Sequence, residues 1–114
     1  MLAKQYRLRK NKEFNFVYKH GKPTHQKLVM MFCVKTKRKP NKIGFSISHK
    51  IGNSVVRHKL KRRLSEIVRA YIPQLNTNFN YVIVARKGLE ELSFAELEKT
   101  VGELFKKSEM LVNV

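Results

Sequence analysis

The chain contains no aspartate, a single cysteine, and no apolar run approaching the roughly 18 residues that indicate a membrane span. Glutamate is therefore the only acid, and its 8 copies are too scattered for the clustered carboxylates of a two-metal nuclease site. Cys33 alone excludes an internal disulfide and a cysteine-rich zinc site. It has no thiolate-stabilising neighbour in the sequence, so we expect it to pack in the sheet. Residues 1–12 are charged and lack the apolar core of a secretory signal, so a cytoplasmic protein is expected.

Positive charge is what the chain has in excess. Its 25 lysines and arginines against 8 acids give a net charge of +17, which is more than solubility requires. Residues 1–63 hold 19 of these cations and a single acid, Glu13, whereas residues 64–114 hold 6 cations and 7 glutamates. This one-sided charge predicts a dedicated face for a polyanion. We expect no membrane partner, because the apolar helix faces are needed for the core.

The length of 114 residues and the 42% apolar content predict one domain, residues 1–114, with one modest core. Residues 1–10 are predicted to form a basic N-terminal arm. Hydrophobic periodicity predicts three helices and three strands in the order α-β-β-α-β-α. The helices are expected at 11–19, about 54–71 and 93–107, and the strands at 27–35, 42–48 and 79–85.

This order predicts an α+β fold, a two-layer α/β sandwich with helices on one face of a sheet. The second strand, the long helix and the third strand form a split βαβ crossover unit. Each proline (Pro23, Pro40 and Pro73) is expected to mark a break between elements. The S-x-x-E sequence from Ser93 to Glu96 predicts a capping box at the start of the last helix.

The long helix carries the densest cationic segment, residues 57–63 (RHKLKRR). No acid is interleaved before Glu66, so the intrahelical ion pairs of an ordinary solvated helix face are missing. The segment therefore favours phosphate binding along the helix and at its capped N-terminus.

Aromatic residues form the second candidate site. Phe14 and Tyr18 share one face of the first helix, and Phe32 lies in the first strand. Exposed aromatic rings beside a basic groove stack on unpaired bases, whereas core packing is the alternative role for each ring. Binding is favoured by the second strand, because its Gly44, Ser46 and Ser48 form a bare face on which a nucleic acid strand can lie.

Four histidines remain as candidates for general acid–base catalysis (His20, His25, His49 and His58). None lies in a spaced motif, and phosphate or base contact is the favoured role. We therefore predict no catalytic residue and no metal site in this chain.

Five segments of the chain resemble, in order, the protein subunit of bacterial ribonuclease P. They are residues 7–14 (RLRKNKEF), 17–21 (VYKHG), 43–48 (IGFSIS), 50–62 (KIGNSVVRHKLKR) and 81–86 (YVIVAR). The fourth resembles the family's K-x-G-x-A-V-x-R-N-R-x-K-R signature, with Arg57-His58-Lys59 in place of Arg-Asn-Arg. This departure keeps the charge, although lysine does not reproduce a bidentate arginine contact.

The resemblance implies that the partners are a large catalytic RNA and precursor tRNA, and we predict no protein partner. The RNA removes the 5′ leader of precursor tRNA and requires magnesium, whereas the protein itself binds no cofactor. It also implies a left-handed crossover, against the usual rule, and a fold like a domain of a small-subunit ribosomal protein. The long helix that carries this signature (the signature helix, about residues 54–71) is expected to contact RNA through Arg57, His58, Lys59, Lys61 and Arg62. The expected leader cleft comprises Phe14, Tyr18, Phe32, Ser46 and Ser48, with additional RNA contacts at Lys50, Arg69 and Arg86.

Two other functions are compatible with the composition. A ribosomal or general RNA-binding protein without a processing role shares the charge and the fold, but has no need of an aromatic cleft. A stand-alone ribonuclease would have to use the histidines, without RNA or metal.

Overall fold

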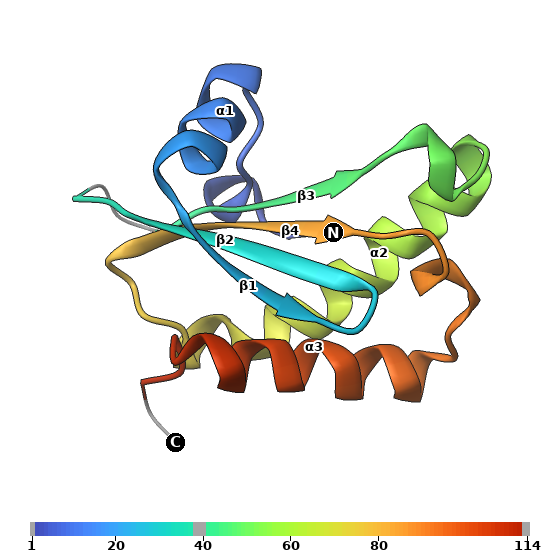
Figure 1. Cartoon of the computed structure of the whole chain (residues 1–114). Coiled ribbons are helices and arrows are strands. Elements are labelled where there is room, and N and C mark those ends of the chain that lie inside the picture. The colour runs from blue at the N-terminus through green and yellow to red at the C-terminus, as the bar shows by residue number, and fades with distance from the viewer. Residues whose placement is uncertain (1, 38–40, 113–114) are drawn as a thin grey trace.

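The computed structural model describes residues 2–37 and 41–112, so the predicted break at Pro40 lies outside the described residues. It contains a four-stranded sheet in the order β1-β2-β4-β3, with β3 parallel to β4 and the other neighbours antiparallel. Figure 1 shows this sheet with α2 and α3 on one side and α1 on the other. The elements are α1 (Asn11–His20), β1 (Lys22–Gln26), β2 (Val29–Lys35), β3 (Ile43–Ile47), α2 (Ser54–Tyr71), β4 (Phe79–Ala85) and α3 (Phe94–Ser108).

Strand β1 was not predicted. Its sequence, KPTHQ, is polar and contains Pro23, which was expected to break an element. The strand lies at the edge of the sheet and pairs only with β2 among the named strands. A proline is tolerated at such an edge, because the N–H that it lacks is not needed on the solvent side.

The α+β class and the crossover are confirmed, whereas the expectation that all helices share one face of the sheet is wrong. Helices α2 and α3 pack on one face and enclose the main core, which includes Leu64, Ile83 and Phe105. Helix α1 packs on the other face through a smaller cluster around Val17 and Val82. Alternate side chains of β4 therefore pack into two different cores, one on each face of the sheet. The left-handed sense of the β3–α2–β4 crossover stays a prediction.

The predicted basic arm is built into the fold. Leu2 joins the main core and Leu8 joins the smaller cluster, and both are buried. The Leu8 amide donates to the Ile43 carbonyl over 3.0 Å, and Arg7 forms an isolated parallel bridge with the same strand. The segment therefore extends the edge of the sheet next to β3 and brings its cations to that edge.

Helix α2 begins and ends where its sequence predicts. The Asn53 side chain accepts from the Val56 amide over 3.0 Å, which satisfies an orphan donor at the N-terminus. Pro73 follows the helix in a short 3₁₀ turn (Ile72–Gln74), as a proline after a helix end commonly does. The predicted capping box at Ser93 and Glu96 is also present at the start of α3.

Two ionisable groups are buried at the centre of the sheet. Burial raises the pKa of the Cys33 thiol from 9.0 to about 12. Burial, with the neighbouring Cys33, also raises the pKa of Tyr81, whose hydroxyl donates to the Asn76 carbonyl over 2.6 Å. Both groups stay neutral in the folded chain at pH values where the unfolded chain ionises them.

Alkaline pH is therefore expected to destabilise the fold. Unfolding releases a proton from Cys33 once the pH exceeds 9.0, so the free energy of unfolding falls between pH 9.0 and about 12. The slope for one such group approaches about 1.4 kcal/mol per pH unit. Urea unfolding of the wild type and of Cys33→Ala, each measured at several pH values below and above 9.0, tests this. Equal pH slopes in the two proteins would contradict it.

Candidate nucleic-acid interface

A cleft of about 510 Å³ lies between the N-terminal segment, α1, β3 and α2. The side chains of four separate segments line it, so it exists only in the folded chain. Phe14 and Tyr18 come from α1, Gly44 and Ser46 from β3, and Lys61 from α2. The remaining lining residues are Leu2, Arg7, Leu8, Arg9, Asn11, Asn15, Ile43, Phe45 and Ser65.

The three predicted aromatic residues lie together. The ring centroids of Phe14 and Tyr18 are 6.4 Å apart, and the Tyr18 ring meets Phe32 edge to face at 5.3 Å. Tyr18 is exposed, whereas Phe14 and Phe32 are half-buried. Phe32 supports the Tyr18 ring from β2 and is not among the residues that line the cleft. The cleft therefore presents Tyr18 and one side of Phe14 to a ligand.

The face of β3 that was predicted to be bare, with Gly44 and Ser46, is partly covered by the Phe14 ring. Gly44 lies under Phe14, and a Cβ at this position would come within 2.5 Å of the Phe14 ring. Ser46 lines the cleft as predicted. Ser48 is not among the lining residues, and its hydroxyl accepts from the Lys50 amide at the start of a 3₁₀ turn (His49–Ile51). Glycine at position 44 thus lets an aromatic ring approach the floor of the cleft.

Gly44→Ala is expected to displace the Phe14 ring. The new Cβ would lie 2.5 Å from Phe14 Cζ and 3.0 Å from Leu8 Cβ, so both must shift. Overpacking of this kind costs about 1–3 kcal/mol of unfolding free energy. Ser46→Ala, two residues along the same strand face, adds no atom and serves as the control in urea unfolding. Equal stability of the two variants would contradict the close approach.

Two arginines of the cleft were not assigned to the site from sequence. Arg7 and Arg9 line the cleft from the N-terminal segment. Arg7 Nε is buried and has no hydrogen-bond partner within residues 2–37 and 41–112. Arg7 therefore carries an unsatisfied donor in the wall of the cleft. The sequence signal that could have assigned Arg7 and Arg9 to the cleft was their position in the RLRKNKEF segment, which ends at Phe14.

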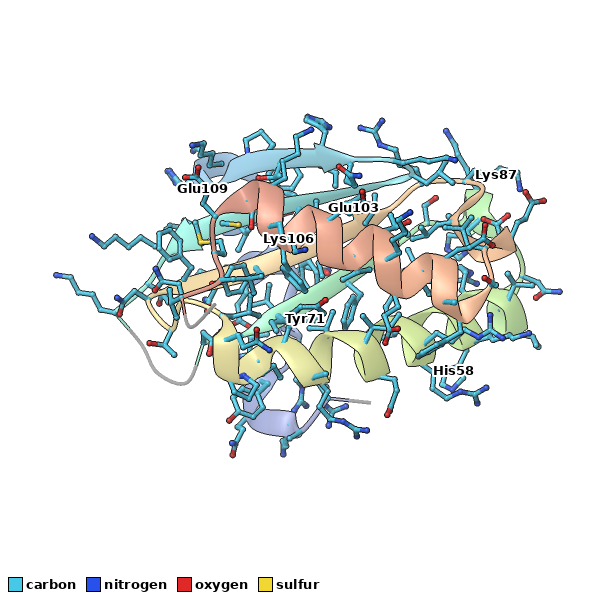
Figure 2. The ribbon with its side chains drawn as sticks, turned by 90° about the horizontal axis from the view of Figure 1, so that it is seen from below. His58, Tyr71, Lys87, Glu103, Lys106 and Glu109 are labelled. Carbon is cyan, nitrogen blue, oxygen red and sulfur yellow. The ribbon has the colours of Figure 1, made fainter. Side chains whose placement is uncertain are left out.

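The signature helix extends the cationic surface away from the cleft. Arg57 and Lys61 line a hollow of about 290 Å³ beside Phe45. His58 lines this hollow and also a second one, of about 500 Å³, together with Lys59 and Arg62. Arg57 Nε donates to the Gly52 carbonyl over 3.2 Å, which holds the side chain at the helix N-terminus. Figure 2 shows His58 pointing outward from α2, away from α3.

The three additional predicted RNA contacts, Lys50, Arg69 and Arg86, do not line the cleft. Lys50 lies exposed in the turn before α2. Arg69 donates to both carboxylate oxygens of Glu66 over 2.7 Å each, in an exposed ion pair. Arg86 follows β4 and contacts the Met30 sulfur at 3.8 Å. Their role in RNA binding stays a prediction.

The acid nearest the cleft, Glu13, is engaged by neighbouring groups. Burial alone would raise the Glu13 pKa, but hydrogen bonds from the Lys10 and Arg9 backbone and the charge of Lys42 lower it overall. Lys42 Nζ lies 3.6 Å from Glu13. The described residues contain no group of three histidines, cysteines or acids that could hold a metal ion. Figure 2 shows Glu103 on α3 and Glu109 just after it, on the side of the sheet away from α1.

In the described ranges no helix has the length and apolar character needed to cross a membrane. The fold is a small α+β domain of the kind solved for bacterial RNase P proteins. It matches the Staphylococcus aureus RNase P protein with a TM-score of 0.88 at 23% identity, covering 95% of this chain and 99% of that one. It matches the Thermotoga maritima RNase P protein with a TM-score of 0.79 at 27% identity, covering 88% and 94%.

Sequence comparison then gives the family. The family model for Ribonuclease P matches residues 2–109, so the chain belongs to this family. It is 34% identical over 110 residues to the Ribonuclease P protein component of Bacillus cereus (strain AH187), with 96% of each protein covered. It is 36% identical over 115 residues to that of Clostridium beijerinckii, with 95% and 92% covered. The chain is thus a protein component of a ribonuclease that acts in tRNA processing, and an RNA partner is implied.

Proposed function

We propose that this chain binds the catalytic RNA of ribonuclease P through the signature helix and holds the single-stranded 5′ leader of precursor tRNA in the cleft. The observation that carries the proposal is the cleft itself, in which the exposed Tyr18 ring and the half-buried Phe14 ring stand beside arginine and lysine side chains. Stacking platforms next to a cationic groove are how proteins bind unpaired nucleotides. A ribosomal-type protein without a processing role has no need of such a cleft.

The leader would be held by two kinds of contact. Tyr18 and Phe14 offer ring faces for bases, and each such stack contributes about 1–3 kcal/mol. Arg7, Arg9 and Lys61 lie around these rings and are suited to phosphates. Glu13 is already compensated by Lys42, so it adds little repulsion.

The chemical step is assigned to the RNA. Magnesium is the metal that the family implies for the holoenzyme, and magnesium prefers carboxylate and phosphate oxygens. The residues around the cleft do not fit a magnesium site of their own, because their nearby acid, Glu13, is occupied by backbone amides and Lys42. The protein's residues would instead bind and orient the substrate and screen phosphate repulsion. Fixed cations would also lower the magnesium concentration that the RNA requires.

The test is cleavage of a long-leader precursor tRNA by a bacterial ribonuclease P RNA at low magnesium. The reaction is run with the RNA and protein together, with the RNA alone and with the protein alone. Rescue of the RNA by a protein that does not cleave by itself is the expected result. Tight, salt-dependent RNA binding without rescue would favour the ribosomal-type function. Cleavage by the protein alone would support the stand-alone ribonuclease, in which histidines act as the general acid and base.

A further inference from the structure

The outer face of α1 carries an aromatic pair that the cleft does not use. Phe16 is 53% exposed, and its ring centroid lies 4.6 Å from that of His20, with 44° between the ring planes. The two residues are four positions apart, so they are neighbours on one helix face. An exposed phenylalanine on an exposed imidazole buries little apolar surface, so core packing does not explain the pair.

Helical geometry places this pair on the side of α1 that faces away from the sheet. At 3.6 residues per turn, Phe16 lies about 160° around the helix from both Phe14 and Tyr18. Lys12 and Lys19 lie within roughly 60° of Phe16 by the same geometry, and both are exposed. We call these four residues (Lys12, Phe16, Lys19 and His20) the outer platform.

The charge around the outer platform favours an anionic ligand. Its two lysines flank the exposed ring. Glu13, the one acid of α1, is paired with Lys42 at 3.6 Å and accepts from the Lys10 amide over 3.2 Å. A ring face between cations is suited to a nucleobase whose phosphates lie on either side.

We propose that the outer platform stacks an unpaired base of the 5′ leader, at a point beyond the nucleotides held in the cleft. This inference rests on the proposed function, since it requires that the cleft holds the leader. It adds a second leader subsite, centred on Phe16, on the opposite side of α1.

The outer platform and the cleft lie on the same helix, so a leader strand that occupies the cleft can continue around α1 to the platform. Asn11 and Asn15 line the cleft, and Asn15 lies between Tyr18 and Lys19 around the helix. A helix with its side chains is about 10–12 Å across, so the path around it from Tyr18 to Phe16 is roughly 15 Å, a few nucleotides of an extended strand. The polar and cationic side chains along this path give the backbone of a leader contacts throughout. Helices α2 and α3 lie on the other side of the sheet from this face (Figure 1). The cleft, in contrast, is lined by residues of α1 itself.

The experiment measures the affinity of the holoenzyme for precursor tRNAs whose leader is shortened stepwise from the 5′ end. With the longest leader, Phe16→Ala is expected to weaken binding by about five- to tenfold, the low end for a base–aromatic stack. Phe16→Tyr keeps the ring and is expected to retain affinity. Phe94→Ala is the matched control, because Phe94 is similarly exposed, at 40%, but lies on α3. Thermal unfolding of each variant verifies that the fold is unchanged.

Leader length separates this inference from the proposed function. As the leader is shortened, the effect of Phe16→Ala should disappear while that of Tyr18→Ala persists. If Phe16→Ala binds like the wild type at every length and Tyr18→Ala does not, the outer platform is refuted and the cleft stands. If neither change matters at any length, the proposed leader cleft is refuted as well. If Phe16→Ala weakens binding equally for mature tRNA, or weakens binding of the catalytic RNA, the occupant is another RNA segment and the inference is wrong.

Discussion

Replacing Lys59, Lys61 and Arg62 together with alanine is expected to weaken binding of the catalytic RNA by about 100-fold or more near physiological salt. Each phosphate contact that is lost also lowers the slope of log affinity against log salt by roughly 0.7–0.9. These three cations lie on the exposed and half-exposed side of α2. Lys59 and Arg62 line the hollow of about 500 Å³, and Lys61 lines both the hollow of about 290 Å³ and the cleft. Binding titrations at several salt concentrations give both quantities.

The control is a second triple variant with the same change in net charge. Lys27, Lys99 and Lys106 are all exposed and lie in the β1–β2 turn and on α3. Their replacement by alanine is expected to leave the salt slope nearly unchanged, because the electrostatic field at α2 falls off within about 8–10 Å in salt. Equal losses in the two triple variants would mean that total charge, not the signature helix, drives binding.

Phe105→Ala is expected to cost about 3–5 kcal/mol of unfolding free energy. Phe105 is fully buried in the main core, and its ring lies 4.9 Å from that of Tyr71. This contact joins α3 to the end of α2, so its loss leaves a cavity between the two helices. Small domains have only about 5–15 kcal/mol of stability in total. Urea unfolding measures the loss.

Phe94→Ala, which removes the same side chain from an exposed site on the same helix, is expected to change stability by less than about 0.5 kcal/mol. A small effect at both positions would contradict the packing of α3 on the main core. RNA binding by the folded fraction of Phe105→Ala should be retained, because α3 contributes no residue to the cleft.

Sequence patterns predicted the helices and strands that have a clear hydrophobic periodicity, and they missed strand β1, which has none. The apolar stripe and the Asn53 cap of α2, like the capping box of α3, are local signals, and both helices form where expected. Strand β1 has a polar sequence and is stabilised by its pairing with β2, which is a tertiary effect. The placement of α1 on the opposite face of the sheet is tertiary too, because it depends on which side of β4 offers Val82.

The candidate site shows the same division. Phe14 and Tyr18 were predicted because their spacing puts them on one helix face, and the structure places both in the cleft. Ser48 fell outside because the chain turns into a 3₁₀ helix at His49. Arg7 and Arg9 were missed as cleft residues because their position depends on pairing between the N-terminal segment and Ile43, which leaves no mark in the local sequence.

The parallel pairing of β3 with β4 has a consequence for the order of events during synthesis. Strand β3 forms one edge of the sheet, and its register joins Ile43 to Tyr81 and Ile47 to Ala85. A ribosome must therefore translate α2 and all of β4 before the floor of the cleft has its neighbouring strand. Long-range pairings of this kind also form late in folding, because the loop must close before its contacts compensate. A nascent chain stalled before Phe79 would carry most of its positive charge but lack a finished cleft.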